Sequence, residues 1–252
     1  MTNTQKKQID LGGIDFLLFD ADGTLFDFDR SERCAFGAIA ERFGFDGSGD
    51  VYEVYHEINA ELWKDFERGL IEKGALLVER FRRLSEKYEF NADPAAVNRE
   101  YLWELGGYGF LLDGAYEVCE KLVKDYRKKL CIVTNGTTQV QKRRFASSEL
   151  SKLLSGVFVS EEIGFPKPDI RYFEHVFSHI KDFDISRALV IGDSLSSDIR
   201  GANTAGVASC WYNPKQKENN EGVVCDYTIS SLWELVPETE SSDKCKSPSV
   251  FV

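Results

Sequence analysis

Two aspartates follow directly on a short apolar run near the start of the 252-residue chain. Asp20 and Asp22 lie within the string D-A-D-G-T-L at 20–25, after 14–19, which has the pattern of a buried strand. A turn would account for one Asp before Gly23, but not for the whole string at a strand end. An aspartate can attack phosphorus to form an aspartyl-phosphate, and a second carboxyl group can serve as general acid and base. The pair therefore predicts phosphoryl-transfer chemistry.

A second polar group follows the apolar run 130–133. Thr134, Asn135 and Gly136 come at the end of this predicted strand. Thr or Asn at such a place is also a common helix cap, so the triplet alone leaves two interpretations open. In the functional one, the Thr134 hydroxyl and exposed backbone N–H groups form a cradle for phosphate. These three residues are candidate substrate ligands.

One lysine is flanked by two prolines. Lys167 lies between Pro166 and Pro168, after the apolar run 156–159. In an ordinary surface turn its side chain would be solvated. The prolines restrain the backbone on both sides, however, which suits an ammonium group aimed at one place. Such a point charge neutralises a phosphate and an attacking carboxylate, so Lys167 is a candidate catalytic residue.

Two more acids follow the apolar run 188–191. Asp193 comes directly at the predicted strand end, and Asp198 lies five positions later. Asp198 is equally typical of an acid at a helix terminus. Carboxylates, a backbone carbonyl, waters and a substrate phosphate are the oxygen ligands that Mg²⁺ prefers. Asp193 therefore predicts part of a magnesium site.

The four polar groups share one position relative to the predicted strands. Short, continuous apolar runs separated by amphipathic helical patterns indicate a parallel sheet that is covered on both faces. A fifth such run is 208–211. We therefore expect an α/β fold with a doubly wound parallel sheet. Ligands in such folds bind outside the carboxyl ends of the strands, where all four groups fall.

One connection is much too long for this fold. About 110 residues separate Asp20 from Thr134, whereas a whole crossover unit needs about 30. Apolar stripes at helical spacing predict helices over 51–66 and 77–88, and a third is expected over 94–105. We expect 28–110 to form a helical cap, or lid, inserted into a core domain made of 1–27 and 111–252. Its aromatic residues are expected mostly in the cap's own core.

Composition excludes several classes of protein. Lys and Arg number 31 against 42 Asp and Glu, a net charge of −11, and no basic run forms a stripe, so binding to a nucleic-acid polymer is not expected. No run has the length of a spanning helix or a signal peptide. The six cysteines are scattered without a C-x-x-C pair, which indicates reduced thiols and a cytoplasmic protein.

Two histidines have the spacing of zinc ligands. His175 and His179 are one helical turn apart. A zinc site would need at least a third ligand, which nothing in the sequence marks, and no Glu follows His175. We therefore interpret both as ordinary surface or packing residues of a helix.

The order of these groups resembles a known enzyme superfamily. D-x-D, T, K and G-D-x4-D at four successive strand ends is the pattern of the haloacid dehalogenase superfamily of phosphatases. Further residues resemble its bacterial pyrimidine 5′-nucleotidase subfamily over about 14–235. The matching segments are 19–29, 134–143, 159–168, 197–206, 210–213 and, in the cap, 62–71. The polar N-terminal extension and the tail after Val236 depart from the pattern without touching the motifs.

The resemblance implies a role for each motif residue. Asp20 would be the nucleophile, and Asp22 would protonate the leaving oxygen and later deprotonate water. Mg²⁺ would be held by Asp20, the main-chain carbonyl of Asp22, and Asp193. Asp198 would orient bound water or Lys167 from behind these ligands. Lys167 would supply the second compensating charge.

Three functions are weighed on this basis. The first is a Mg²⁺-dependent phosphomonoesterase on a small phosphorylated metabolite, with a nucleotide, and above all a pyrimidine nucleoside monophosphate, as the expected substrate. The second is another phosphatase or a mutase on the same scaffold, acting on phosphoglycolate or a sugar phosphate. The third is a non-catalytic binding protein, which intact motifs disfavour. A haloacid dehalogenase is also disfavoured, because halide displacement needs neither an acid at Asp22 nor a metal site.

Overall fold

A six-stranded parallel sheet forms the centre of the protein. The computed structural model describes residues 9–88 and 90–236. The sheet has the strand order β3-β2-β1-β4-β5-β6, and every neighbouring pair is parallel. The strands are β1 (Phe16–Phe19), β2 (Lys129–Thr134), β3 (Leu154–Val159), β4 (Ala188–Gly192), β5 (Ala208–Tyr212) and β6 (Tyr227–Ile229). The doubly wound parallel fold expected from the sequence is thereby confirmed.

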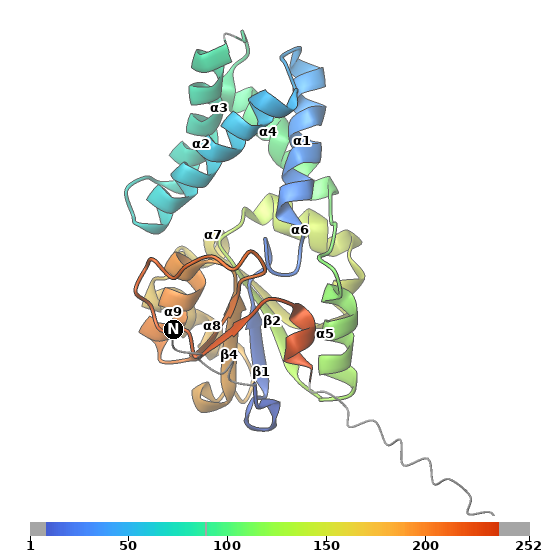
Figure 1. Ribbon diagram of the computed structural model, residues 1–252, viewed down its shortest axis with the longest axis vertical. Coiled ribbons are helices and arrows are strands. Elements are labelled where there is room, and N and C mark those ends of the chain that lie inside the picture. Colours follow the sequence, from blue (N-terminus) through green and yellow to red (C-terminus); the bar gives the residue numbers. More distant parts are fainter. Residues whose placement is uncertain (1–8, 89, 237–252) are drawn as a thin grey trace, which may run out of the picture.

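Helices cover both faces of this sheet. Alternate residues of β1 point to opposite faces, so Leu17 and Phe19 enter one core cluster while Phe16 and Leu18 enter the other. The helices of the core are α5 (Ala115–Lys124), α6 (Thr138–Ser147), α7 (Ser160–Ile163), α8 (Ile170–His179) and α9 (Arg200–Ala205). α5 packs on the first face, while α8 and α9 pack on the second (Figure 1). This two-sided cover explains the continuous apolar runs of the central strands.

The central place of β1 brings the motifs together. Phe19 is aligned with Ile132 of β2 on one side and with Ile191 of β4 on the other. The chain crosses from β1 to β2 on one side and later returns to β4 on the other. This reversal is the topological switch point at which open α/β sheets form a ligand crevice. Asp20 leaves β1 at that point, and its backbone N–H donates to the Ile191 carbonyl at 2.8 Å.

The long insertion is helical, as expected. It contains α1 (Phe28–Phe43), α2 (Gly49–Glu67), α3 (Lys73–Tyr88) and α4 (Pro94–Gly107). These four helices stand over the carboxyl edge of the sheet (Figure 1), and we call them the cap. Their core is aromatic: Tyr55 stacks on Phe36 at 4.8 Å and on Phe81 at 5.2 Å between ring centroids. Most cap aromatics therefore serve the cap's own packing, although Tyr88, counted in a predicted apolar stripe, is exposed.

The first cap helix has only a weak signal in the sequence. α1 begins where Asp27 caps it, its carboxylate accepting from the Arg30 N–H at 3.0 Å, and it ends at Gly44 in the left-handed region (φ 70°). Its buried apolar residues are few, because Ser31 and Glu32 take two of its inward positions. An apolar stripe interrupted in this way does not stand out by periodicity.

Three details differ from the sequence-based expectation. The run 156–159 belongs to an edge strand, and Val157 is 39% exposed, so β3 is not covered on both faces. Strand β6 follows a polar segment and was not expected. A π-helical turn over Leu195–Ile199 precedes α9, so the regular helix starts after Asp198.

No helix of the described chain is long and apolar enough to cross a membrane. Residues 1–8 of the polar N-terminal extension and the C-terminal tail after Val236 lie outside the described residues.

Candidate active site

Lys167 lies at the centre of the site. Its ammonium group donates to Asp20 Oδ1 at 2.7 Å, to Asp198 Oδ1 at 2.6 Å and to the Val133 carbonyl at 2.6 Å. All three ammonium protons are therefore used, and the side chain is only 1% exposed. The alternative of a solvated surface lysine is wrong. The interpretation of Asp198 as a simple helix-terminal acid is also wrong, since its other oxygen accepts from the Ser194 N–H at 3.1 Å.

Burial of this cluster sets its electrostatics. Burial opposes the charge on Lys167, but the Asp198 and Asp20 carboxylates outweigh it and raise the pKa of the lysine. Burial also raises the pKa of Asp20 well above its usual value; Lys167 opposes this shift, while Asp198 and Asp193 add to it. Burial and the Asp198 carboxylate raise the pKa of Asp193 to about 7. Full ionisation of the three carboxylates would therefore leave more negative charge than one lysine compensates.

A glycine allows the Asp193 carboxylate to lie close to the loop that carries Asp20 and Asp22. Gly23 has φ 82°, and a Cβ added there would meet Asp193 Oδ2 at 2.8 Å. The Trp211 indole N–H donates to the Asp193 carbonyl at 3.0 Å and so holds that end of β4. One carboxylate oxygen each from Asp20, Asp193 and Asp198 lies within 4.8 Å of the others. A crowded, partly desolvated set of hard oxygen atoms of this kind suits a divalent cation.

The Thr134–Gly136 turn is built around its own side chains. Asn135 exchanges two hydrogen bonds with the Lys167 backbone, each 2.9 Å long, and so holds the loop that carries the lysine. Thr134 Oγ1 accepts from the Gly136 N–H at 3.0 Å. α6 starts after its N-cap, Thr137, so none of the three residues is the helix cap that the sequence left open. All three line the same cavity as Asp20 and Lys167.

Asp22 is held by two residues that the sequence analysis did not select. Gln141 Nε2 donates to Asp22 Oδ2 at 2.6 Å, and the Arg144 guanidinium is bonded to Asp22 Oδ1. Both lie on α6, three positions apart and fully or almost fully buried. A buried Gln and Arg on one helix face are the available signal, because long polar side chains are rarely buried without a partner.

One face of α2 lines the cavity over these groups. The cavity has a volume of about 290 Å³, and its core side is formed by the motif residues. Most of the cap side comes from one face of α2, namely His56, Asn59, Ala60, Trp63 and Glu67, and the start of α1 adds Phe28 and Asp29. The apolar stripe predicted from the sequence packs α2 into the cap and does not include this neighbouring face. Its mixture of polar, small and aromatic residues was the signal that could have found it.

The turn between α2 and α3 contacts the core on two sides of the cavity. The hydroxyl groups of Ser194 and Ser196 donate to the Glu67 carboxylate, the first at 3.3 Å. Lys73 donates to the Gly136 carbonyl at 3.1 Å and to Ser160 Oγ at 3.2 Å. These contacts join the cap to the loop that carries Asp198 and to the Thr134–Gly136 turn.

The two histidines with zinc-like spacing lie elsewhere. His175 and His179 stack on α8 with ring centroids 4.0 Å apart, and His179 Nδ1 bonds to the His175 carbonyl. Among the described residues, neither belongs to a cluster of three possible metal ligands.

Comparison with known proteins agrees with this arrangement. The family model of haloacid dehalogenase-like hydrolases matches residues 14–206, which include every motif described above. The chain belongs to this family. The match runs through the cap as well as strands β1 to β4 of the sheet, so the family assignment covers both parts of the fold.

Several members of the family resemble the chain over most of its length. Hydrolase YfnB of Bacillus subtilis is 36% identical over 87% of this chain and 92% of its own. Pyrimidine 5′-nucleotidase PynA of Streptococcus pneumoniae is 36% identical over 88% and 93%, and pyrimidine 5′-nucleotidase YjjG of Escherichia coli is 31% identical over 88% and 96%. The crystal structure of YfnB bound to magnesium, which reveals interdomain movement, superposes with a TM-score of 0.84, covering 88% of this chain and 96% of that one. The chain is accordingly a phosphatase.

Proposed function

We propose that the protein is a Mg²⁺-dependent nucleoside 5′-monophosphatase that works through an aspartyl-phosphate on Asp20. The observation that carries the proposal is the three-way contact of Lys167 with Asp20 and Asp198 at the floor of the cavity. It sets the carboxylate of Asp20 beside a positive charge and at the edge of a space that admits a ligand. A carboxylate in that place can attack a phosphate that Lys167 has partly neutralised.

The acidic cluster supports the metal. Asp20, Asp193 and the main-chain carbonyl of Asp22 would hold Mg²⁺, while Asp198 already uses both oxygens to bind Lys167 and the Ser194 N–H. A bound divalent cation would compensate the excess negative charge and polarise a phosphate oxygen. Because burial and its neighbours raise the pKa of Asp20, such compensation also favours the ionised form that attacks. A structure relative, YfnB, is bound to magnesium.

The remaining motif residues act on the phosphate and the leaving group. Thr134 and the backbone around Gly136 would orient the phosphate oxygens from the wall of the cavity. Asp22 would give a proton to the leaving oxygen and later take one from water. The cap, 28–110 in our division of the chain, would close over the bound substrate and exclude bulk water.

The substrate class is inferred from the cap and from the relatives. The motif residues recognise the phosphate and the metal. Because every phosphomonoester carries the same phosphate group, selectivity for the rest of the substrate must come from the α2 face that lines the cavity. That face offers one large aromatic wall, Trp63, beside polar groups, which suits a flat base with hydrogen-bonding edges. Two relatives at 31–36% identity are pyrimidine 5′-nucleotidases. We therefore place pyrimidine nucleoside monophosphates first.

Phosphate release from a panel of monophosphates tests the proposal. We expect kcat/KM for UMP, dUMP or dTMP to exceed that for phosphoglycolate and glucose 6-phosphate by at least about tenfold, or 1.4 kcal/mol. EDTA is expected to abolish turnover, and added Mg²⁺ to restore it. A preference for phosphoglycolate or a sugar phosphate would contradict the nucleotidase assignment and leave the phosphatase chemistry intact. Phosphate release unaffected by EDTA would contradict the role of the metal.

A further inference from the structure

A buried carboxylate organises the polar interior of the cap. The Glu32 side chain on α1 has no exposed surface. Its Oε1 accepts from Asn59 Nδ2 at 2.7 Å, while its Oε2 accepts from the Tyr52 hydroxyl at 3.1 Å and bonds His56 Nδ1 at 2.5 Å. Three donors from α2 thus satisfy a group whose burial would otherwise be strongly unfavourable. These contacts fix the rotation of α2 relative to α1.

The network continues behind Asn59 and holds both ends of its side-chain amide. Asn59 Oδ1 accepts from Arg80 Nη1 at 3.1 Å, so both ends of its amide have partners. Arg80 also donates to Asn98 Oδ1 at 2.8 Å and to the Leu77 carbonyl at 3.1 Å. Asn59 therefore borders the cavity as part of a rigid wall.

In this network, His56 uses one ring nitrogen, Nδ1, and its other ring nitrogen, Nε2, remains available for a ligand. Because a carboxylate only accepts, Nδ1 is the donor to Glu32, and Nε2 lies on the other side of the ring. Within the described residues Nε2 has no hydrogen-bond partner, and the side chain is 37% exposed. The ring also packs against Tyr52, with centroids 5.9 Å apart. A histidine that served packing alone would not need a buried carboxylate to set its orientation.

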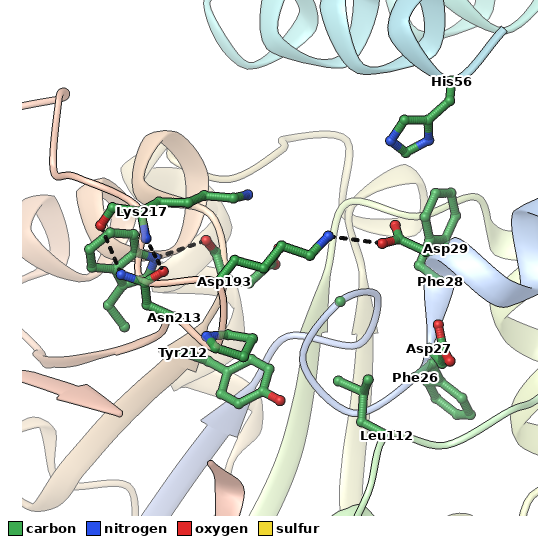
Figure 2. Close-up of a pocket in the computed structure, with 14 residues that line it drawn as sticks. Phe26, Asp27, Phe28, Asp29, His56, Leu112, Asp193, Tyr212, Asn213 and Lys217 are labelled. Atoms are coloured by element: carbon green, nitrogen blue, oxygen red, sulfur yellow. Dashed lines mark hydrogen bonds and ion pairs between the residues drawn. The ribbon is translucent and has the colours of Figure 1, made fainter. Parts of the chain in front are cut away.

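The free side of this ring faces the site. His56 lines the cavity that holds Asp20 and also an adjoining one of about 270 Å³, bounded by Phe28, Tyr212 and Lys217. Figure 2 shows the imidazole projecting from α2 into this second space, above Phe28. Gly23 and Asp193 likewise line both cavities, so His56 lies at the junction of the two. A group that extends from a phosphate bound at Asp20 toward the second cavity therefore comes near His56.

We propose that His56, oriented by Glu32, is the specificity-determining residue that binds an acceptor oxygen on the organic part of the substrate. The inference rests on the proposed function and extends it to one atom, Nε2. The phosphate has its own ligands on the core side of the cavity, whereas His56 approaches from the cap. For a pyrimidine nucleotide the acceptor is a ring carbonyl or a sugar hydroxyl.

The charges around the ring favour its donor form. The hydrogen bond to Glu32 raises the pKa of His56, partial burial opposes the shift, and the carboxylates of Glu32, Asp29 and Glu53 add to it. A protonated ring presents an N–H at Nε2, which matches an oxygen acceptor. Of the lysines that line the second cavity, Lys215 donates to the Asp29 carboxylate at 3.0 Å.

Three substrates of increasing size test the inference on the full-length enzyme. Phenyl phosphate has no acceptor on its leaving group, ribose 5-phosphate adds sugar hydroxyls, and UMP adds the base. His56→Phe keeps a flat ring against Tyr52 but removes both nitrogens. We expect it to lower kcat/KM for UMP about tenfold to a hundredfold, the effect of losing a hydrogen bond to a charged group. Its kcat/KM for phenyl phosphate is expected to stay within about threefold of wild type.

Two further variants separate orientation from packing. Tyr52→Phe removes another bond to the same Glu32 oxygen without touching the cavity lining, so the ratio of UMP to phenyl phosphate activity is expected to stay unchanged. Glu32→Gln is expected to lower that ratio, because Glu32 is a positioning residue for the ring. Unchanged phenyl phosphate activity in each variant reports that the protein is folded.

The outcomes are distinct. A loss confined to UMP identifies the base carbonyl as the acceptor, and an equal loss on ribose 5-phosphate identifies a sugar hydroxyl; either supports the inference. An equal loss on phenyl phosphate, or no loss on any substrate, overturns it. If wild-type enzyme prefers ribose 5-phosphate to UMP, the nucleotidase proposal fails, while comparison of ribose 5-phosphate with phenyl phosphate still decides the role of His56.

Discussion

The Asp22 carboxylate is paired with Arg144, a guanidinium that has no exposed surface. Arg144 also donates to the Tyr108 carbonyl at 3.2 Å, just beyond the last cap helix, and lies over the Phe26 ring. The proposed general acid is therefore tied to the base of the cap through one buried side chain. A movement of this junction, such as an opening of the cap, would directly shift the Asp22 carboxylate.

This pair predicts coupled effects of mutation. Arg144→Lys keeps a positive charge but loses the planar geometry that serves Asp22 and Tyr108 together. We expect the effects of Arg144→Lys and Asp22→Asn on kcat to be non-additive, with a coupling of at least about 0.5 kcal/mol. A double-mutant cycle on UMP hydrolysis measures it. Strictly additive effects would mean that Arg144 does not act through Asp22.

The charge on Asp20 is predicted to be essential. Asp20→Asn keeps the shape of the side chain and its place beside Lys167 but removes the nucleophile. The loss of kcat can reach about 10⁶-fold for a removed nucleophile. Asp15→Asn, at the opposite end of β1 and paired with Arg187 on the surface, is the matched control and should stay active. Turnover by Asp20→Asn within about tenfold of wild type would exclude the covalent mechanism.

Asp22 is predicted to matter in proportion to the leaving group. General acid–base assistance is typically worth about 10²–10⁴-fold. Asp22→Asn should therefore slow nucleotides by such a factor and slow p-nitrophenyl phosphate much less, because that phenolate leaves without a proton. Steady-state kinetics on both substrates provide the comparison. If kcat/KM, which reports on formation of the aspartyl-phosphate and not on its hydrolysis, falls equally for both substrates, Asp22 serves structure or the metal instead.

The His56–Glu32 contact predicts a pH dependence of stability. Because this contact raises the pKa of His56 above its usual value of 6.5, the protonated ring stabilises the folded state at low pH. That stabilisation is fully present below pH 6.5 and is lost as the pH rises through the higher pKa of the folded protein. Between pH 6 and pH 9, Tm of wild type should fall more than Tm of His56→Phe. Parallel Tm curves for the two proteins would count against the charged contact.

The positions of the motifs in the chain predicted most of the catalytic floor. Asp20 and Thr134 directly follow apolar runs, and Asp193 follows one after a single glycine; parallel strands bring such positions to one edge of a sheet. Where local pattern was a weaker guide, the expectation was less accurate. The apolar run ending in Val159 became an edge strand with Val157 exposed, because cover by helices on both faces depends on its neighbours and not on the run itself.

Local sequence patterns did not predict the contacts between segments that are far apart in the chain. Gln141 and Arg144 lie 119 and 122 positions from Asp22, and no local pattern links them to it. Glu32 and His56 are 24 positions apart on different helices, and Glu32 even weakened the helical signal of α1 by taking an inward position. Which charged residues meet inside a fold depends on how whole helices pack.

The amino-acid sequence alone was enough to predict the family, the parallel sheet with its helical cap, and the residues that meet at the strand ends. These follow from local strings, from the period of apolar residues and from the rule that parallel strands end at one edge. The contacts of α6 with Asp22 and the position of His56 at the cavity, by contrast, are evident only in the folded protein. The rotation of a helix about its axis is set by packing and by buried polar bonds such as those of Glu32, which no window of the sequence contains.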